Sequence, residues 1–149
     1  PMLQDINMVS APAIATERGI AVSESRQELS AVYDSLIRIT ITGASGVKVF
    51  AGTVVAGAPR VVEINGVELD APFAPAMLYA NNEDKPGFIG KLGVLLGDRG
   101  VNIATFNLGR TIAGGDAIAL VGIDQAADDR LLEEVRALPH VREARALRF

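Results

Sequence analysis

The stretch that decides the fold of the C-terminal half is Asn82-Glu83-Asp84-Lys85-Pro86-Gly87-Phe88-Ile89-Gly90-Lys91-Leu92, which runs on to Gly100-Val101-Asn102-Ile103. Pro86 pre-sets the backbone dihedral for a first helical turn, and Gly100 is typical of a helix end. Between them the apolar residues share one helical stripe: Phe88, Leu92, Leu95 and Leu96. The sequence therefore predicts a helix over residues 87–99, between strands at residues 76–82 and 101–110.

The start of this predicted helix is a candidate site for an anionic group. The amides of Gly87, Phe88 and Ile89 have no acceptor inside their own helix. Together with the positive end of the helix dipole they can receive a carboxylate. Gly87 also leaves room for a ligand to approach.

Polar side chains on both sides of the helix complete the candidate site. Asp84 and Asn82 lie just ahead of the helix and can hold an ammonium group, and Lys85 lies in the same loop. Asn102 begins the following strand, and its amide can both donate and accept. This set fits an amino acid. The plainer alternative is that Asp84 is only an acidic residue near a helix N-terminus, where such residues are common.

The remaining elements of this half complete a known order. Residues 113–116 form a turn into a strand at 117–123, and Asp124 is predicted to cap a helix that ends at Leu138. Residues 141–147 form a last strand, whose Arg-rich alternation suits a sheet edge. The order βαββαβ is that of ferredoxin-like folds. One sheet face is left without helices, so a homodimer that joins the sheets by their edges or faces is expected.

The first half is predicted to be β-rich. A short helix begins near Ser10 and ends near Gly19, and it is expected to cover one side of a sheet. Strands are predicted at residues 36–42, 47–50 and 60–64, and Asn65-Gly66 predicts a type I′ hairpin. Two prolines in residues 71–75 mark the domain boundary. The fold class is therefore α+β, with domains at 1–75 and 76–149.

Composition excludes several classes of partner. The chain has 149 residues, 49% hydrophobic and 21% charged, with a net charge of −4. Nucleic acid and anionic membranes both need a concentrated positive face, so neither is an expected partner. No stretch reaches the apolar length of a membrane span. The lack of cysteine fits a cytoplasmic location. No initiator methionine precedes Pro1, which predicts the tail end of a longer protein.

No catalytic or metal-binding constellation is predicted. Without cysteine, and with His140 as the single histidine, sulfur-ligated or multi-histidine metal sites within one chain are excluded. No histidine is suitably placed to activate a serine, and the glycines of the predicted helix match no phosphate-binding motif. The chain alone is therefore not expected to be an enzyme.

These residues resemble the C-terminal regulatory region of long-form D-3-phosphoglycerate dehydrogenases. The loop at residues 82–87 together with residues 100–103 is similar to the pattern of an ACT domain. The upstream segments at residues 10–20 and 62–66 resemble the intervening domain that precedes ACT in these enzymes, although its first strand and helix are expected to be missing.

The resemblance implies a regulatory role with defined partners. L-serine is the implied effector, bound where two ACT domains meet in a homodimer, and the parent enzyme is implied to be a tetramer that uses NAD. Asn82 and Asp84 would contact the serine ammonium or hydroxyl group, and Asn102 would come from the facing subunit. Arg60 is the one well-placed basic residue for the anion site implied for the intervening domain. This chain itself carries no NAD site.

Two alternatives stay open at this point. One alternative to the serine sensor is a structural oligomerisation module without a ligand. The other is a regulatory part of a serine or threonine deaminating enzyme. The helix at residues 10–20 favours the dehydrogenase over the deaminating enzyme, whereas only ligand binding separates a sensor from a structural module.

Overall fold

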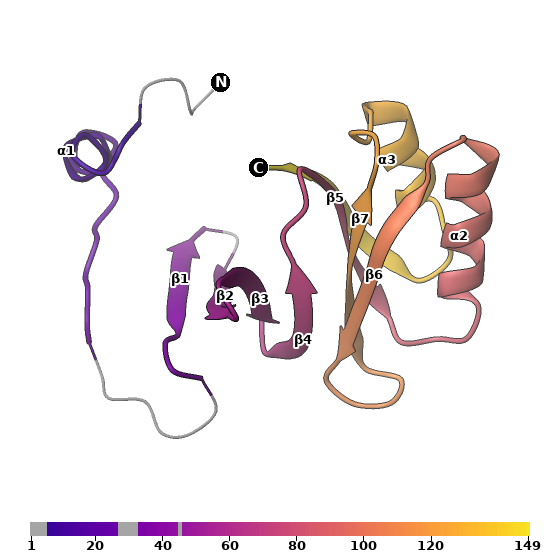
Figure 1. Cartoon of the computed structure of the whole chain (residues 1–149), viewed down its shortest axis with the longest axis horizontal. Coiled ribbons are helices and arrows are strands. Elements are labelled where there is room, and N and C mark those ends of the chain that lie inside the picture. Colours follow the sequence, from indigo (N-terminus) through magenta and orange to yellow (C-terminus); the bar gives the residue numbers. More distant parts are fainter. Residues whose placement is uncertain (1–5, 27–32, 45) are drawn as a thin grey trace. The chain divides into compact units, whose positions relative to one another are not determined.

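The computed structural model describes residues 6–26, 33–44 and 46–149, in two units that span residues 1–30 and 31–149. The first unit holds one helix, α1 (Ala11–Glu17), which begins after Ser10 as predicted and has no buried residue (Figure 1). Gly19 follows the helix with a positive φ of 68°, which suits a helix end. That this helix covers a sheet stays a prediction.

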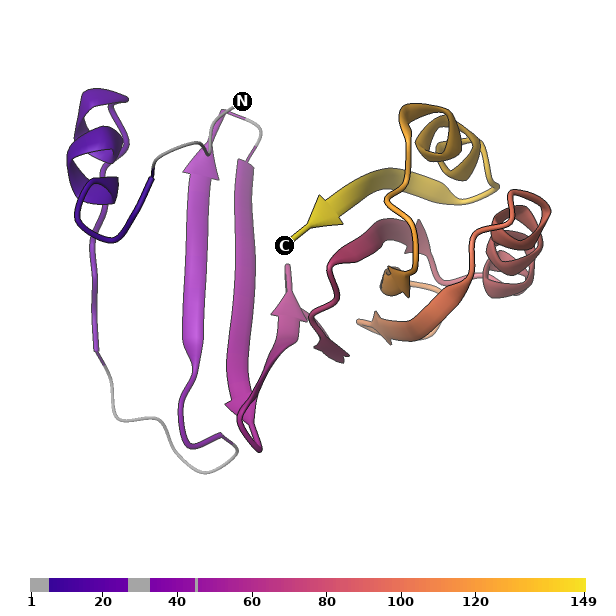
Figure 2. The same cartoon turned by 45° about the horizontal axis from the view of Figure 1, so that its top comes forward.

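The second unit begins with a four-stranded antiparallel sheet in the order β1-β2-β3-β4 (Figures 1 and 2). Its strands are β1 (Ile37–Gly43), β2 (Gly46–Val55), β3 (Ala58–Ile64) and β4 (Val67–Pro72). Asn65 and Gly66 both have positive φ, as the predicted type I′ turn requires. Ala56 and Gly57 form a second turn of this kind, so β2 runs further than the sequence predicted.

A second antiparallel sheet follows in the order β6-β7-β5-β8. It contains β5 (Ala76–Glu83), β6 (Ile103–Arg110), β7 (Asp116–Ile123) and β8 (Val141–Arg148). The helices α2 (Phe88–Asp98) and α3 (Asp129–Arg136) lie on the same side of this sheet (Figure 2). This order confirms the α+β class and the ferredoxin-like βαββαβ arrangement.

The prediction that Asp124 caps the last helix is wrong. The N-cap of α3 is Asp128, whose carboxylate accepts a hydrogen bond from the Leu131 amide at 2.7 Å. The helix begins there because its buried face is made of Leu131, Leu132 and Val135, and Asp128 precedes that face by one turn.

Both faces of the second sheet are covered within this chain. One face forms a core with α2 and α3, including Leu78, Leu92 and Val135. On the other face, Ile64, Val67 and Ala71 of the first sheet pack with four residues of the second: Met77, Tyr79, Ile118 and Leu120. The sequence argument that the face without helices requires a partner subunit is therefore wrong, because β3 and β4 cover it.

Candidate functional site

The candidate site lies where β5 passes into α2. Gly87 is the N-cap of α2 in a left-handed conformation (φ 97°) that favours glycine. Its carbonyl accepts from the Lys91 amide at 3.0 Å. Pro86 therefore lies just outside the helix and not in its first turn, which corrects the sequence prediction. Within the described ranges, the amides of Phe88 and Ile89 have no hydrogen-bond acceptor, as at other helix starts.

Asp84 is held in place by the turn between β6 and β7. Its Oδ2 accepts from Arg110 Nη1 at 2.7 Å and from the Gly114 amide at 3.1 Å, and its own amide donates to the Gly115 carbonyl at 2.8 Å. The hydrogen bonds from Arg110 and Gly114 lower the pKa of Asp84. This carboxylate is therefore charged and oriented, and it does not cap α2 as the plainer alternative supposed.

Asn82 lies beneath this loop and is only 1% exposed. Its Nδ2 donates to the Glu83 carbonyl at 2.8 Å, while its Oδ1 is buried with no donor among the described residues. A buried acceptor without a donor costs free energy, so it is rare in folded proteins. Asn82, like its neighbour Asn81, therefore has a buried amide oxygen without a donor in the described part of the chain, close to the candidate site.

The other loop residues have structural partners. Lys85 Nζ lies 3.3 Å from Glu83 Oε1 and lowers the pKa of Glu83, and His140 Nδ1 lies 3.5 Å from the second oxygen. The Phe88 side chain is buried in the core, whereas Ile89 is 56% exposed. Phe88 and Ile89 therefore contribute backbone amides to the site, while the Phe88 ring fixes the helix on the sheet.

Asn102 lies at the opposite end of the same sheet. Its Nδ2 donates to Asp124 Oδ2 at 2.8 Å, and its carbonyl accepts from the Asp124 amide at 3.2 Å. In the sheet register, β7 begins opposite Glu83 and ends opposite Ile103, so the length of this strand, about 25 Å, separates the two ends. One chain does not bring Asn102 and Asp84 together.

Sequence reasoning missed Arg110 and the turn residues Gly114 and Gly115. They lie 26 or more residues after Asp84, so no local pattern joins them. The one local signal was an arginine at the end of a strand followed by a glycine turn.

Comparison with known proteins agrees with this architecture. Residues 1–65 match the family model described as the D-3-phosphoglycerate dehydrogenase intervening domain, and residues 76–140 match that of the ACT domain. The chain therefore matches an intervening domain followed by an ACT domain, each over a little less than half of its length. The exact domain boundary at residue 75 stays a prediction.

Three similar curated proteins carry the name D-3-phosphoglycerate dehydrogenase. The Bacillus subtilis protein is 34% identical over 137 residues, which covers 91% of this chain and 26% of the relative. The Synechocystis protein is 34% identical over 140 residues, with 93% and 25% covered. The Methanocaldococcus jannaschii protein is 30% identical over 142 residues, with 95% and 27% covered. The chain thus spans about a quarter of the length of these relatives.

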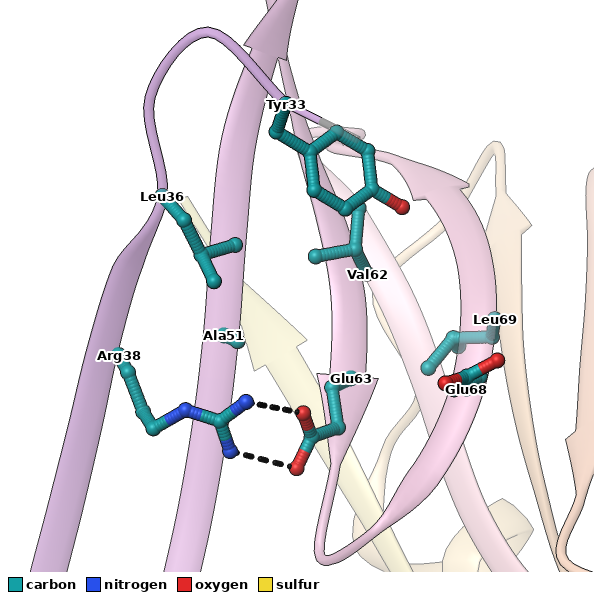
Figure 3. Close-up of a pocket in the computed structure, with 8 residues that line it drawn as sticks. All are labelled: Tyr33, Leu36, Arg38, Ala51, Val62, Glu63, Glu68 and Leu69. Carbon is teal, nitrogen blue, oxygen red and sulfur yellow. Dashed lines mark hydrogen bonds and ion pairs between the residues drawn. The ribbon is translucent and has the colours of Figure 1, made fainter. Parts of the chain in front are cut away.

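In the intervening half, the predicted anion-site residue Arg60 is already paired. Its Nε bonds Asp70 Oδ1 across β3 and β4. Elsewhere on this sheet, Arg38 and Glu63 form a bidentate ion pair beside a pocket (Figure 3). Across the described ranges, no three metal-binding side chains gather in one place, and no helix has the length and apolarity to cross a membrane.

Proposed function

We propose that this chain is the serine-sensing and oligomer-forming regulatory region of a D-3-phosphoglycerate dehydrogenase. In this proposal the parent enzyme is a cytoplasmic tetramer that oxidises 3-phosphoglycerate with NAD, and L-serine inhibits it by feedback. One observation carries the proposal. The open amides at the start of α2 lie on the same loop as Asp84, whose carboxylate is fixed by Arg110 and Gly114.

This arrangement suits a zwitterion. The amides after Pro86, with the helix dipole, are a receptor for the α-carboxylate. Asp84 Oδ2 is engaged by the chain, but within the described residues its Oδ1 has no partner and is available to the α-ammonium group. The buried Oδ1 of Asn82 is the acceptor that a serine hydroxyl would satisfy if the loop adjusts around it.

The outer face of α2 supports a contact with a second subunit. The side of α2 that is not buried carries Ile89, Gly90, Gly93, Val94 and Gly97, flanked by the charged Lys91 and Asp98. A Cβ added to any of these glycines would meet nothing within 4 Å, so packing inside this chain does not explain them. Each costs about 1 kcal/mol of helix stability relative to alanine. Close approach of another helix explains why they are tolerated.

We infer that α2 packs antiparallel on α2 of a second copy, next to the edge strand β6. A twofold axis across such a pair places the start of one helix beside the end of the other. Asp84 precedes α2 and Asn102 follows it, so the pair would bring Asp84 of one subunit to Asn102 of its partner. Because Asp84 and Asn102 lie apart within one chain, a complete site would then require the dimer.

Calorimetric titration of the chain with L-serine tests the sensor function, with glycine and D-serine as controls. Saturable heat is expected for L-serine. The Asp84→Ala variant should weaken binding by at least about tenfold because a charged partner is lost. Glu133→Ala removes an exposed acid of α3, away from the α2 pair, and should leave binding unchanged. No saturable heat at millimolar L-serine would overturn the proposal and favour a structural oligomerisation module.

A mixing experiment tests whether the site is shared between subunits. Asp84→Ala and Asn102→Ala are each expected to bind serine poorly. After refolding together in equal amounts, half of the dimers are mixed, and each mixed dimer contains one intact site. Recovery of about a quarter of the wild-type sites is therefore expected. No recovery, with mixed dimers demonstrated by mass spectrometry, would place the site within one chain.

A further inference from the structure

A pocket on the first sheet has no role in the function proposed above. Its volume is about 500 Å³, within the range of small-molecule sites. Glu63 lies next to Ile64 in β3 and points to the opposite face of the sheet. A register shift between Val61 and Glu63 interrupts the alternation there, and Val62 and Leu69 also line the pocket. The lining residues come from all four strands and the segment before β1 (Figure 3): Tyr33, Leu36, Arg38, Ala51, Val62, Glu63, Glu68 and Leu69.

A row of side chains across the strands sets the charge of the pocket. Arg38 lies opposite Ala51, and Ala51 lies opposite Glu63. The small Ala51 lets Arg38 reach across β2, where Nη1 and Nη2 contact the two oxygens of Glu63 at 2.8 and 2.7 Å. This pairing raises the pKa of Arg38. The guanidinium is therefore committed to Glu63 and does not face the pocket as a free cation.

Glu68 continues the row directly opposite Glu63 in the pairing of β3 with β4. Like charges at opposed positions of an antiparallel pair are destabilising. Among the described residues, no cation or hydrogen-bond donor pairs with the Glu68 side chain. The nearest basic residue of β3, Arg60, is engaged by Asp70. The pocket thus carries one negative charge in excess.

The walls of the pocket are apolar. Leu36, Val62 and Leu69 surround the floor at Ala51, and the Tyr33 ring lies over one end in Figure 3. Apolar walls with a few polar groups at one side are typical of small-molecule sites. An aromatic ring can stack on Tyr33 while a charged end reaches the carboxylates.

We propose that this pocket binds a small organic cation that has a primary ammonium group on an apolar body. The ammonium pairs with the Glu68 carboxylate, beside the Arg38–Glu63 ion pair. The apolar body lies over Ala51 against Leu36 and Tyr33. The site is independent of the serine site, so either proposal can fail without the other.

Titration of the 149-residue chain with 2-phenylethylammonium chloride tests the charge preference. Two probes match its size at constant ionic strength: 3-phenylpropanoate has the opposite charge, and 2-phenylethanol has none. The ammonium compound should bind saturably and at least about threefold more tightly than either, the range of an exposed ion pair. Equal or tighter binding of the carboxylate, or no saturable binding of the amine, would overturn the proposal.

Two variants locate the site. Glu68→Gln should weaken 2-phenylethylammonium binding by about threefold or more, while Asp98→Asn, the same charge change on α2, should leave it unchanged. Arg38→Gln should tighten binding because it releases Glu63 to the ligand. If the pocket bound anions instead, Arg38→Gln would weaken binding, because the variant removes the guanidinium. Unchanged binding in Glu68→Gln, with an unaltered circular dichroism spectrum, would refute the assignment.

Discussion

Gly109→Ala tests the packing of β4 against the second sheet. Gly109 lies near the end of β6, and a Cβ built on it would lie 2.0 Å from the Glu68 carbonyl oxygen. The same Cβ would lie 2.9 Å from the carbonyl carbon and 3.0 Å from Val67 Cγ1. The obstacle is backbone, so no side-chain rotation relieves it. The two strands must separate by about 1 Å to restore an ordinary contact distance.

The size of the effect follows from what that separation disturbs. Overpacking a close-packed region typically costs about 1–3 kcal/mol. Val67 belongs to the apolar cluster shared by the two sheets and is 1% exposed, so its contacts loosen when β4 moves. Alanine favours a strand over glycine by a smaller amount. We therefore expect Gly109→Ala to lower the free energy of unfolding by about 2 kcal/mol.

Urea denaturation at 25 °C measures this change as a lower midpoint with an unchanged slope. Ala104→Val adds apolar volume at an exposed position of the same strand and should change stability by less than about 0.5 kcal/mol. A Gly109→Ala chain as stable as the parent would refute the reasoning, because it would mean that β4 does not press on β6 in solution.

Three further predictions concern charge and the surface of α2. The Arg110 hydrogen bond lowers the pKa of Asp84 in the folded chain. The stability that Asp84 contributes is therefore complete above its unfolded pKa of about 4 and is lost as pH falls through the lower folded pKa. Asp84→Asn should show a shallower fall of the urea midpoint over this acid range, and an identical fall would contradict the prediction. Burial raises the pKa of Tyr79 in the folded chain. The stability that Tyr79 contributes is therefore present below its unfolded pKa of about 10 and is lost as pH rises through the higher folded pKa. Tyr79→Phe should lose less stability between pH 9 and 11 than the parent chain, and an equal loss would count against the raised pKa. Gly93→Ala should stabilise the isolated chain by about 0.5–1 kcal/mol but raise the dimer dissociation constant in sedimentation equilibrium, whereas unchanged dimerisation would remove the α2 face from the interface.

Local patterns were sufficient for much of the fold. Asn65-Gly66 predicted its turn because positive φ at two adjacent residues is a local requirement. The helical stripe of Phe88, Leu92 and Leu96 is the face that α2 buries. In both cases a few neighbouring residues determine the conformation, so the sequence was informative.

Contacts between distant segments were not predicted. The helix cap was assigned to Asp124, although Asp128 fills this role and Asp124 binds Asn102. Both are aspartates shortly before the helix, and only packing decides between them. The partners of Asp84 lie in and just before a turn far along the chain. No local sequence pattern predicts contacts between residues so far apart. The cover that β4 provides for the second sheet was missed for the same reason.

The strand β6 connects the proposed effector site with β4 of the first sheet. Asn102 directly precedes β6, while Arg110 ends it and binds Asp84. A ligand held by Asp84 of one subunit and Asn102 of its partner would therefore restrain opposite ends of two β6 strands. Gly109 precedes Arg110 in the chain and lies so close to the β4 backbone that a Cβ at this position would clash with the Glu68 carbonyl. Because packed interiors transmit small displacements, a shift of β6 must move β4 or break this contact. In the proposed dimer, the close approach of Gly109 to the Glu68 carbonyl would carry a displacement from the serine site to the first sheet, and a side chain at position 109 would disturb this approach.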